Sequence, residues 1–274
     1  MTEKISAIVL DITRHNDRMN VITLYSRSRG RLSFLSPIGS GKSRQMRQAR
    51  LQPLAVIESD INFKATAELQ RLGSFSFLTV WHDIYFNPVK QIMALFLSEF
   101  LNKLLRATMP DENLWDYIFN SLRLLDNTTE GISNFHIAFL SSLLPFVGIQ
   151  PDNSGYKYGY CFDMQSGTFK SDPAFQSNPA DLTSISDQQY DISEKSPFPG
   201  HNILENANNS PILSGVEAYM AAILCRINFS NVNALRLNRQ LRYKILLRLL
   251  QYYSFHFPGS GNLKSLDIIH EIFR

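Results

Sequence analysis

Residues 5–36 contain three short apolar runs separated by polar turns, and this stretch decides the fold of the N-terminal part. The runs are ISAIVLDIT at 5–13, MNVITLYS at 19–26 and GRLSFLS at 30–36. β-Branched and aromatic residues are frequent in all three, and the RHNDR and RSRG segments between them are typical of turns. The sequence therefore predicts a meander of three antiparallel strands.

Two further strands are expected at 54–63 and 70–77, after a polar, basic connection at 39–50. Five antiparallel strands in about 80 residues fit a small closed barrel better than a sandwich. Periodicity does not choose between an OB-type and an SH3-like barrel. The predicted first domain is residues 1–80.

The apolar period changes from two to 3.6 residues at Pro88, which predicts a helical domain over residues 81–274. Helices are expected from Pro88 to about residue 105, and then at 111–126, 134–147, 214–229, 232–254 and 263–273, with Asp111 as an N-cap. Residues 151–210 interrupt the pattern with a polar insertion that contains one hairpin, at 158–162 and 168–170. The fold class is therefore α+β.

Composition indicates a soluble globular chain rather than a disordered or fibrous one. Apolar residues make up 44% of the 274 residues and charged residues 19%. The two cysteines, Cys161 and Cys225, are far apart and cannot form a four-thiolate zinc site. We find no signal peptide or membrane span, so we expect a cytoplasmic, nucleoid-associated protein with no cofactor.

Charge is distributed unevenly along the chain, although the net charge is only +3. Residues 1–50 carry ten basic and three acidic side chains, a balance of +7. Residues 107–217 carry four basic and 14 acidic side chains, a balance of −10, and no carboxylate occurs between Glu217 and Asp267. Two basic blocks that flank an acidic segment suggest a polyanionic partner.

The candidate DNA-binding residues are 13 of the arginines and lysines of these two blocks. They are Arg14, Arg18, Arg27, Arg29, Arg31, Lys42, Arg44, Arg47, Arg50, Arg236, Arg239, Arg242 and Lys244. Such groups neutralise phosphates without reading sequence, and Tyr25 or Phe34 could stack on bases if either faces outward. The spacing of the last four is expected to place most of them on one helix face, opposite Leu241 and Ile245. A merely solvated charged surface is the alternative.

Catalytic motifs are missing from the sequence, so we do not expect an enzyme. The GKS at 41–43 resembles a phosphate-binding loop, but that motif requires a glycine where Ser36 stands. The six histidines show no metal-ligand spacing, and no G-x-S-x-G nucleophile motif occurs.

Several segments, in this order, resemble the RecO family of bacterial DNA-repair proteins. They are IVL at 8–10, DR at 17–18, VITLYS at 21–26, GRLS at 30–33, LQPL at 51–54, the run from 246 to 253, His256 and LKSL at 263–266. The resemblance covers most of the chain except residues 151–210. It implies an OB-fold followed by a helical domain. The family often inserts a four-cysteine zinc module, but only Cys161 occurs there, so the hairpin is interpreted as a metal-free remnant.

The resemblance also implies a function, that of a recombination mediator. Such a protein binds single- and double-stranded DNA, anneals complementary strands, engages the acidic tail of the single-strand-binding protein, and works with RecR to load RecA. Candidate cations for the tail are Lys90, Lys103, Arg106 and Arg123, or the set from Arg236 to Lys244. An RNA-binding module, a protein adaptor and an enzyme with scattered catalytic residues stay open as alternatives.

Overall fold

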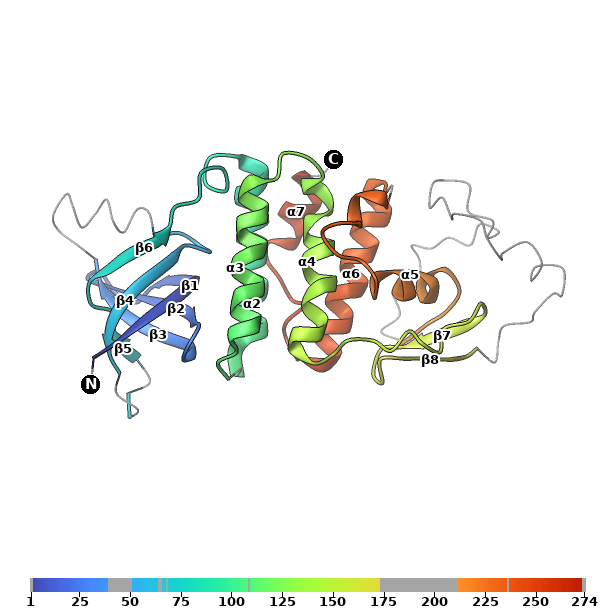
Figure 1. Ribbon diagram of the computed structural model, residues 1–274, viewed down its shortest axis with the longest axis horizontal. Helices are drawn as coiled ribbons and strands as arrows, with labels where there is room; N and C mark the ends of the chain where they lie inside the picture. Colours follow the sequence, from blue (N-terminus) through green and yellow to red (C-terminus); the bar gives the residue numbers. More distant parts are fainter. Residues whose placement is uncertain are drawn as a thin grey trace. The chain divides into compact units, whose positions relative to one another are not determined.

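The computed structural model describes residues 2–38, 51–63, 66, 67, 69–107, 109–172, 211–235 and 237–272. The chain divides into two compact units, which are described separately. Unit 1 comprises Met1–Ile132 and Gly259–Arg274, and unit 2 comprises Ser133–Pro258. Figure 1 shows the sheet of β1 to β6 with helices α2, α3 and α7 of unit 1, and helices α4, α5 and α6 of unit 2.

The sheet of unit 1 has the strand order β5-β3-β2-β1-β4-β6. Its strands are β1 (Thr2–Arg14), β2 (Met19–Ser26), β3 (Gly30–Pro37), β4 (Val56–Asn62), β5 (Leu69–Arg71) and β6 (Phe75–Thr79). Neighbouring strands are antiparallel except for β3 and β5, which are parallel. The predicted three-stranded meander is confirmed.

The single strand predicted at 70–77 is wrong, because the chain forms two strands there, at opposite edges of the sheet. Between β5 and β6 the chain bends at residues 72–74, where Ser59 Oγ donates to the Ser74 carbonyl over 3.1 Å. A Cβ atom on Gly73 would lie 3.2 Å from the Asp60 carbonyl oxygen, so glycine allows this close approach. Residues 72–74 can span at most about 14 Å between the Cα atoms of Arg71 and Phe75. The edge strands β5 and β6 are therefore close together at this connection, so the sheet curls strongly there. The described strands show no ladder between β5 and β6, so the structure does not show a closed barrel.

The first strand is buried on both faces, which explains its continuous apolar run. Ala7 and Val9 belong to the core on one face of the sheet. Ile8 points to the other face because side chains alternate along a strand, and it is also fully buried. On that face Ser98 Oγ of α2 (Pro88–Leu104) donates to the Leu10 carbonyl over 2.6 Å. Helix α2 therefore belongs to the same unit as the sheet.

The helices α2 and α3 of unit 1 begin where the sequence predicts, whereas the helix predicted from residue 263 begins at Leu266. Asn87 caps α2 by accepting from the Val89 amide, and Asp111 caps α3 (Glu112–Asn127). The last helix, α7 (Leu266–Ile272), returns to this unit. Glu99 of α2 accepts hydrogen bonds from the Lys264 and Ser265 amides, each over 2.9 Å, and thereby anchors the segment that leads into α7.

In the residues that the structure describes, unit 2 combines three α-helices with a small sheet. Its elements are α4 (Phe135–Leu143), α5 (Val216–Leu224), α6 (Arg239–His256), β7 (Tyr160–Asp163), β8 (Thr168–Ser171) and β9 (Ile212–Leu213), in the strand order β8-β7-β9. The predicted hairpin is confirmed by the antiparallel pairing of β7 and β8. The helix predicted from 232 begins instead at Arg239, where the Asn238 side chain caps it. Residues 173–210 of the predicted insertion lie outside the described residues.

Short 3₁₀ helices connect these elements. They are η1 (Leu105–Ala107), η2 (Ile132–Asn134), η3 (Leu144–Val147) and η5 (Val232–Ala234).

Secondary structure changes from strand to helix between β6 and α2, near the predicted boundary at residue 80. The compact units, however, divide at residue 132, because α2 and α3 contact the sheet.

Candidate nucleic-acid interface

The turn between β1 and β2 presents two of the predicted DNA-binding side chains to solvent. Arg14 and Arg18 flank this turn and both are exposed. Arg14 Nη2 lies 2.8 Å from Asp17 Oδ1, yet 69% of the Arg14 side chain is accessible. An exposed ion pair of this kind contributes about 0–1 kcal/mol, so a phosphate can replace Asp17 at little cost.

The end of β3 lies beside this turn. The Ile38 amide donates to the Arg18 carbonyl over 2.7 Å, and Pro37 pairs with Met19 across the β2–β3 ladder. Ile38 is the last described residue before the basic connection at 39–50. The predicted residues of that connection, which are Lys42, Arg44, Arg47 and Arg50, lie outside the described residues. The chain therefore enters its most basic connection at the end of the sheet that carries Arg14 and Arg18.

Arg71 lies toward the same end of the sheet and was missed by the sequence analysis. In the parallel pairing of β3 and β5, Arg71 lies opposite Leu35, two residues before the end of β3 at Pro37. Arg71 is exposed. A single arginine within a predicted strand gives no charge cluster, so only the strand pairing reveals its position. We call Arg14, Arg18 and Arg71 the basic end of the sheet.

The arginines of the turn between β2 and β3 lie at the opposite end of these strands and pair with carboxylates. Arg27 Nη2 lies 3.0 Å from Asp116 Oδ2, and the Arg27 guanidinium lies 5.7 Å from the centroid of the Trp115 ring. Arg29 Nη2 lies 2.7 Å from Glu3 Oε2. Both positive charges are therefore compensated within unit 1, which weakens their attraction for phosphate.

Arg31 and the two aromatic candidates are committed to the interior of unit 1. Arg31 is half-buried, and its Nη1 donates to the Asn102 carbonyl over 2.7 Å. Burial lowers the pKa of Arg31 below its usual value, and the nearby Arg106 lowers it further. Tyr25 and Phe34 have no exposed surface, so the expectation that either stacks on bases is wrong.

The C-terminal basic set does not form one exposed face. Arg242 is half-buried, its Nε donates to Asn134 Oδ1 over 2.9 Å, and its Nη2 donates to the Leu237 carbonyl over 3.0 Å. Arg239 is also half-buried, whereas Arg236 lies outside the described residues. The set therefore offers less charge to solvent than its sequence suggests.

Lys244 lies on the side of α6 that was expected to be purely apolar. It lines a pocket together with Leu241 and Ile245, so the expected separation of charged and apolar faces is wrong here. An α-helix turns about 100° per residue, so residues two positions apart project about 200° apart. Arg242 and Lys244 therefore lie on nearly opposite sides of the helix.

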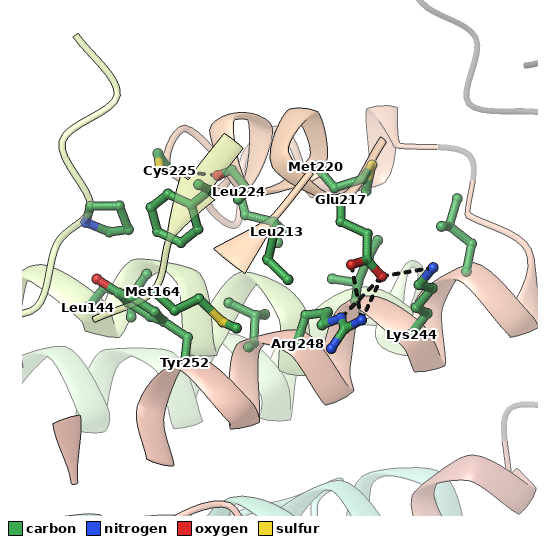
Figure 2. Close-up of a pocket in the computed structure, with 16 residues that line it drawn as sticks. Leu144, Met164, Leu213, Glu217, Met220, Leu224, Cys225, Lys244, Arg248 and Tyr252 are labelled. Carbon is green, nitrogen blue, oxygen red and sulfur yellow. Dashed lines mark hydrogen bonds and ion pairs between the residues drawn. The ribbon is translucent and has the colours of Figure 1, made fainter. Parts of the chain in front are cut away.

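The pocket in unit 2 is formed between α5, α6 and the small sheet, and it has a volume of about 690 Å³, part of it open to solvent. Figure 2 shows its apolar lining, to which Leu144, Leu213 and Tyr252 contribute. Lys244 and Arg248 of α6 are its two cations, and Glu217 of α5 pairs with both. The pocket thus combines an apolar lining with a charged rim.

The other cations that were considered for an acidic tail lie in unit 1, and two of them are engaged there. Lys90 is buried, with its Nζ 2.5 Å from Asp83 Oδ2. Lys103 Nζ lies 3.3 Å from Glu99 Oε1. Arg106 and Arg123 are exposed.

The residues of the small sheet do not fit a zinc module. Cys161 is buried in β7 and its Sγ donates to the Lys170 carbonyl over 3.5 Å. Burial raises the pKa of the Cys225 thiol to about 11, so this second thiol is a poor metal ligand. Within the described ranges no three His, Cys, Asp or Glu side chains gather as a metal site. No helix in the same ranges has the length and apolar character needed to cross a membrane.

Comparison with known proteins covers both units. Residues 1–80 match the family model described as Recombination protein O N terminal, and residues 86–154 match the model described as Recombination protein O C terminal. The chain is 31% identical over 271 residues to the DNA repair protein RecO of Porphyromonas gingivalis, with 97% of each chain covered. It is 29% identical over 273 residues to the DNA repair protein RecO of Bacteroides fragilis, with 100% of each chain covered.

Proposed function

Because this chain belongs to the RecO family of DNA repair proteins, we propose that it mediates recombination by binding single- and double-stranded DNA and annealing complementary strands. In this proposal it acts with RecR to help load RecA onto DNA that is covered by single-strand-binding protein. The family is one of mediators and not of enzymes, in agreement with the lack of catalytic motifs in the sequence.

The observation that carries the DNA-binding proposal is the basic end of the sheet. Arg14, Arg18 and Arg71 are exposed there, and Ile38 leads from the same end into the basic connection at 39–50. The strong curl of the sheet supports the proposal that unit 1 contains an OB-type barrel. OB folds bind single strands along a positively charged groove that follows the backbone.

Annealing requires that two polyanionic strands approach each other. Cationic side chains that neutralise phosphates lower the repulsion between the strands, and they leave the base edges free because they do not read sequence. Exposed arginines on a strand end and a turn suit this task, since they hold the backbone by charge alone.

A salt titration of oligonucleotide binding tests this proposal. If about five phosphates are neutralised, the logarithm of the binding constant for single-stranded DNA should fall with the logarithm of the salt concentration with a slope near −3.5. A slope near zero would refute the phosphate model. Competition by an RNA of the same sequence distinguishes a DNA-binding protein from the alternative of an RNA-binding module. A fluorescence assay of strand annealing distinguishes both of these from a protein adaptor.

The pocket of unit 2 is our proposed docking site for the acidic, aromatic-ended tail of the single-strand-binding protein. Its apolar lining suits an aromatic ring, and Lys244 and Arg248 at its rim suit carboxylates. Replacing Arg248 by Met should lower the affinity for a peptide of four aspartates and a C-terminal phenylalanine, measured by calorimetry. The matched control is Lys157→Met, which removes the same charge from an exposed site of unit 2. Equal affinities of these two variants would contradict this docking site.

A further inference from the structure

One carboxylate already occupies the two cations that border the pocket of unit 2. Glu217 Oε1 lies 2.9 Å from Lys244 Nζ and 2.9 Å from Arg248 Nη2. Arg248 Nη2 also donates to Glu217 Oε2 over 3.0 Å, and Arg248 Nε donates to Oε1 over 3.1 Å. Figure 2 shows all three side chains gathered on one side of the pocket.

The geometry leaves an incoming anion little access to Arg248. The Nε and Nη2 groups donate to Glu217, and Nη1 donates to Gln251 Oε1 over 2.7 Å. The side chains of Glu217, Lys244 and Arg248 expose only 22%, 19% and 18% of their surfaces, so solvent screens this cluster less than a surface pair. A ligand carboxylate that binds the Nε and Nη2 edge of Arg248 has to take these donors from Glu217.

We propose that Glu217 is an internal competitor, which holds the anion position of the pocket and yields it to the carboxylate of an acidic peptide. This inference rests on the proposed docking of such a peptide in the pocket. Glu217 lies in the first turn of α5. The amino terminus of a helix favours a negative charge, so the displaced carboxylate remains in a stabilising field. Exchange of one carboxylate for another then has a moderate cost.

The competition also determines which anions the pocket accepts. Two cations and one carboxylate leave a local charge of +1, so a ligand gains little from charge alone. A nucleic-acid backbone would have to break the Glu217 pairs without filling the apolar lining. A peptide that carries a carboxylate next to an aromatic or aliphatic group recovers that cost by burying the apolar group. Glu217 therefore selects acidic peptides over phosphate polyanions in unit 2.

The variant Glu217→Gln tests the proposal, because it keeps the shape of the side chain and removes its charge. Its affinity for the peptide of four aspartates and a C-terminal phenylalanine should rise about tenfold, which corresponds to about 1.4 kcal/mol. The matched control is Glu130→Gln, which removes the same charge from an exposed position in unit 1 and should change the affinity less than about twofold. Calorimetry measures the affinity, and circular dichroism during heating shows that each variant is folded.

Each outcome decides between distinct explanations. An unchanged affinity in Glu217→Gln means that Glu217 does not compete, and a lower affinity means that it positions Lys244 and Arg248 for the peptide; both results overturn the proposal. If Glu217→Gln does not fold, Glu217→Asp withdraws the carboxylate by one methylene group and should raise the affinity in the same direction. If Arg248→Met binds the peptide as well as the unaltered chain does, the pocket itself is not the docking site, and both proposals fail.

Discussion

The two turns of the β1–β2–β3 meander should contribute very differently to DNA binding, although the sequence gives them similar charge. Arg14 and Arg18 flank the first turn, where they are exposed and only Arg14 forms a surface ion pair. Arg27 and Arg29 flank Ser28 in the second turn, where Asp116 and Glu3 compensate them. We therefore compare the double variant R14A/R18A with the double variant R27A/R29A.

The expected magnitudes follow from the release of counterions. Each phosphate contact with a single strand contributes about −0.7 to the slope of log K against log salt. Loss of Arg14 and Arg18 should change a slope of about −3.5 to about −2.1, whereas loss of Arg27 and Arg29 should leave it near −3.5. Between 50 and 200 mM salt, the unaltered chain would then lose affinity about 130-fold and R14A/R18A only about 20-fold.

The assay is fluorescence polarisation of a labelled thymidine oligonucleotide at five salt concentrations. Circular dichroism at each salt concentration verifies that R27A/R29A stays folded, because this variant loses three ion pairs within unit 1. If both double variants flatten the salt dependence equally, or if R27A/R29A flattens it more, the division of the basic residues into a binding end and a structural end is wrong.

Three further outcomes are expected. Replacing the four cations of the connection at 39–50 by Ala should weaken binding to oligonucleotides of all base compositions alike, because phosphate contacts carry no sequence information; the residues are Lys42, Arg44, Arg47 and Arg50. Burial, together with the charge of Arg242, lowers the pKa of His136 to about 3. As the pH falls below about 6.5, the unfolded chain therefore protonates His136 and the folded chain does not. The free energy of unfolding should then fall by about 2 kcal/mol from pH 7.5 to pH 5 because of this group. Urea unfolding of His136→Gln should lack this part of the pH dependence. Incubation with EDTA should leave the thermal midpoint unchanged, since two separated cysteines cannot form a four-thiolate site.

The sequence predicted those strands and helix starts that are determined by residues close to one another in the chain. Alternation and turn residues located the first three strands, and the side chains of Asn87 and Asp111 cap helices that begin at the expected positions. The close approach of Gly73 to Asp60 could not be predicted, because it joins residues of different strands that only the fold brings together.

Ion pairs between residues distant in sequence explain why the sequence did not show which of the predicted basic residues are already paired with carboxylates. Arg27 and Asp116 are 89 positions apart, so no pattern in the sequence marks this arginine as paired. The same is true of Lys244 and Glu217, which the fold brings together across α5 and α6. Charge counts along a chain predict the sign of a surface, whereas the fold decides which charges remain available to a ligand.

The return of the last 16 residues to unit 1 has a consequence for biosynthesis. A ribosome releases the N-terminal sheet early, but Glu99 gains its partners Lys264 and Ser265 only when the end of the chain has emerged. Unit 1, which we propose binds DNA, is therefore completed after the whole of unit 2 has been synthesised. A truncated product that ends after Pro258 would carry the sheet without the hydrogen bonds of Glu99 to Lys264 and Ser265, so unit 1 would lack this anchor.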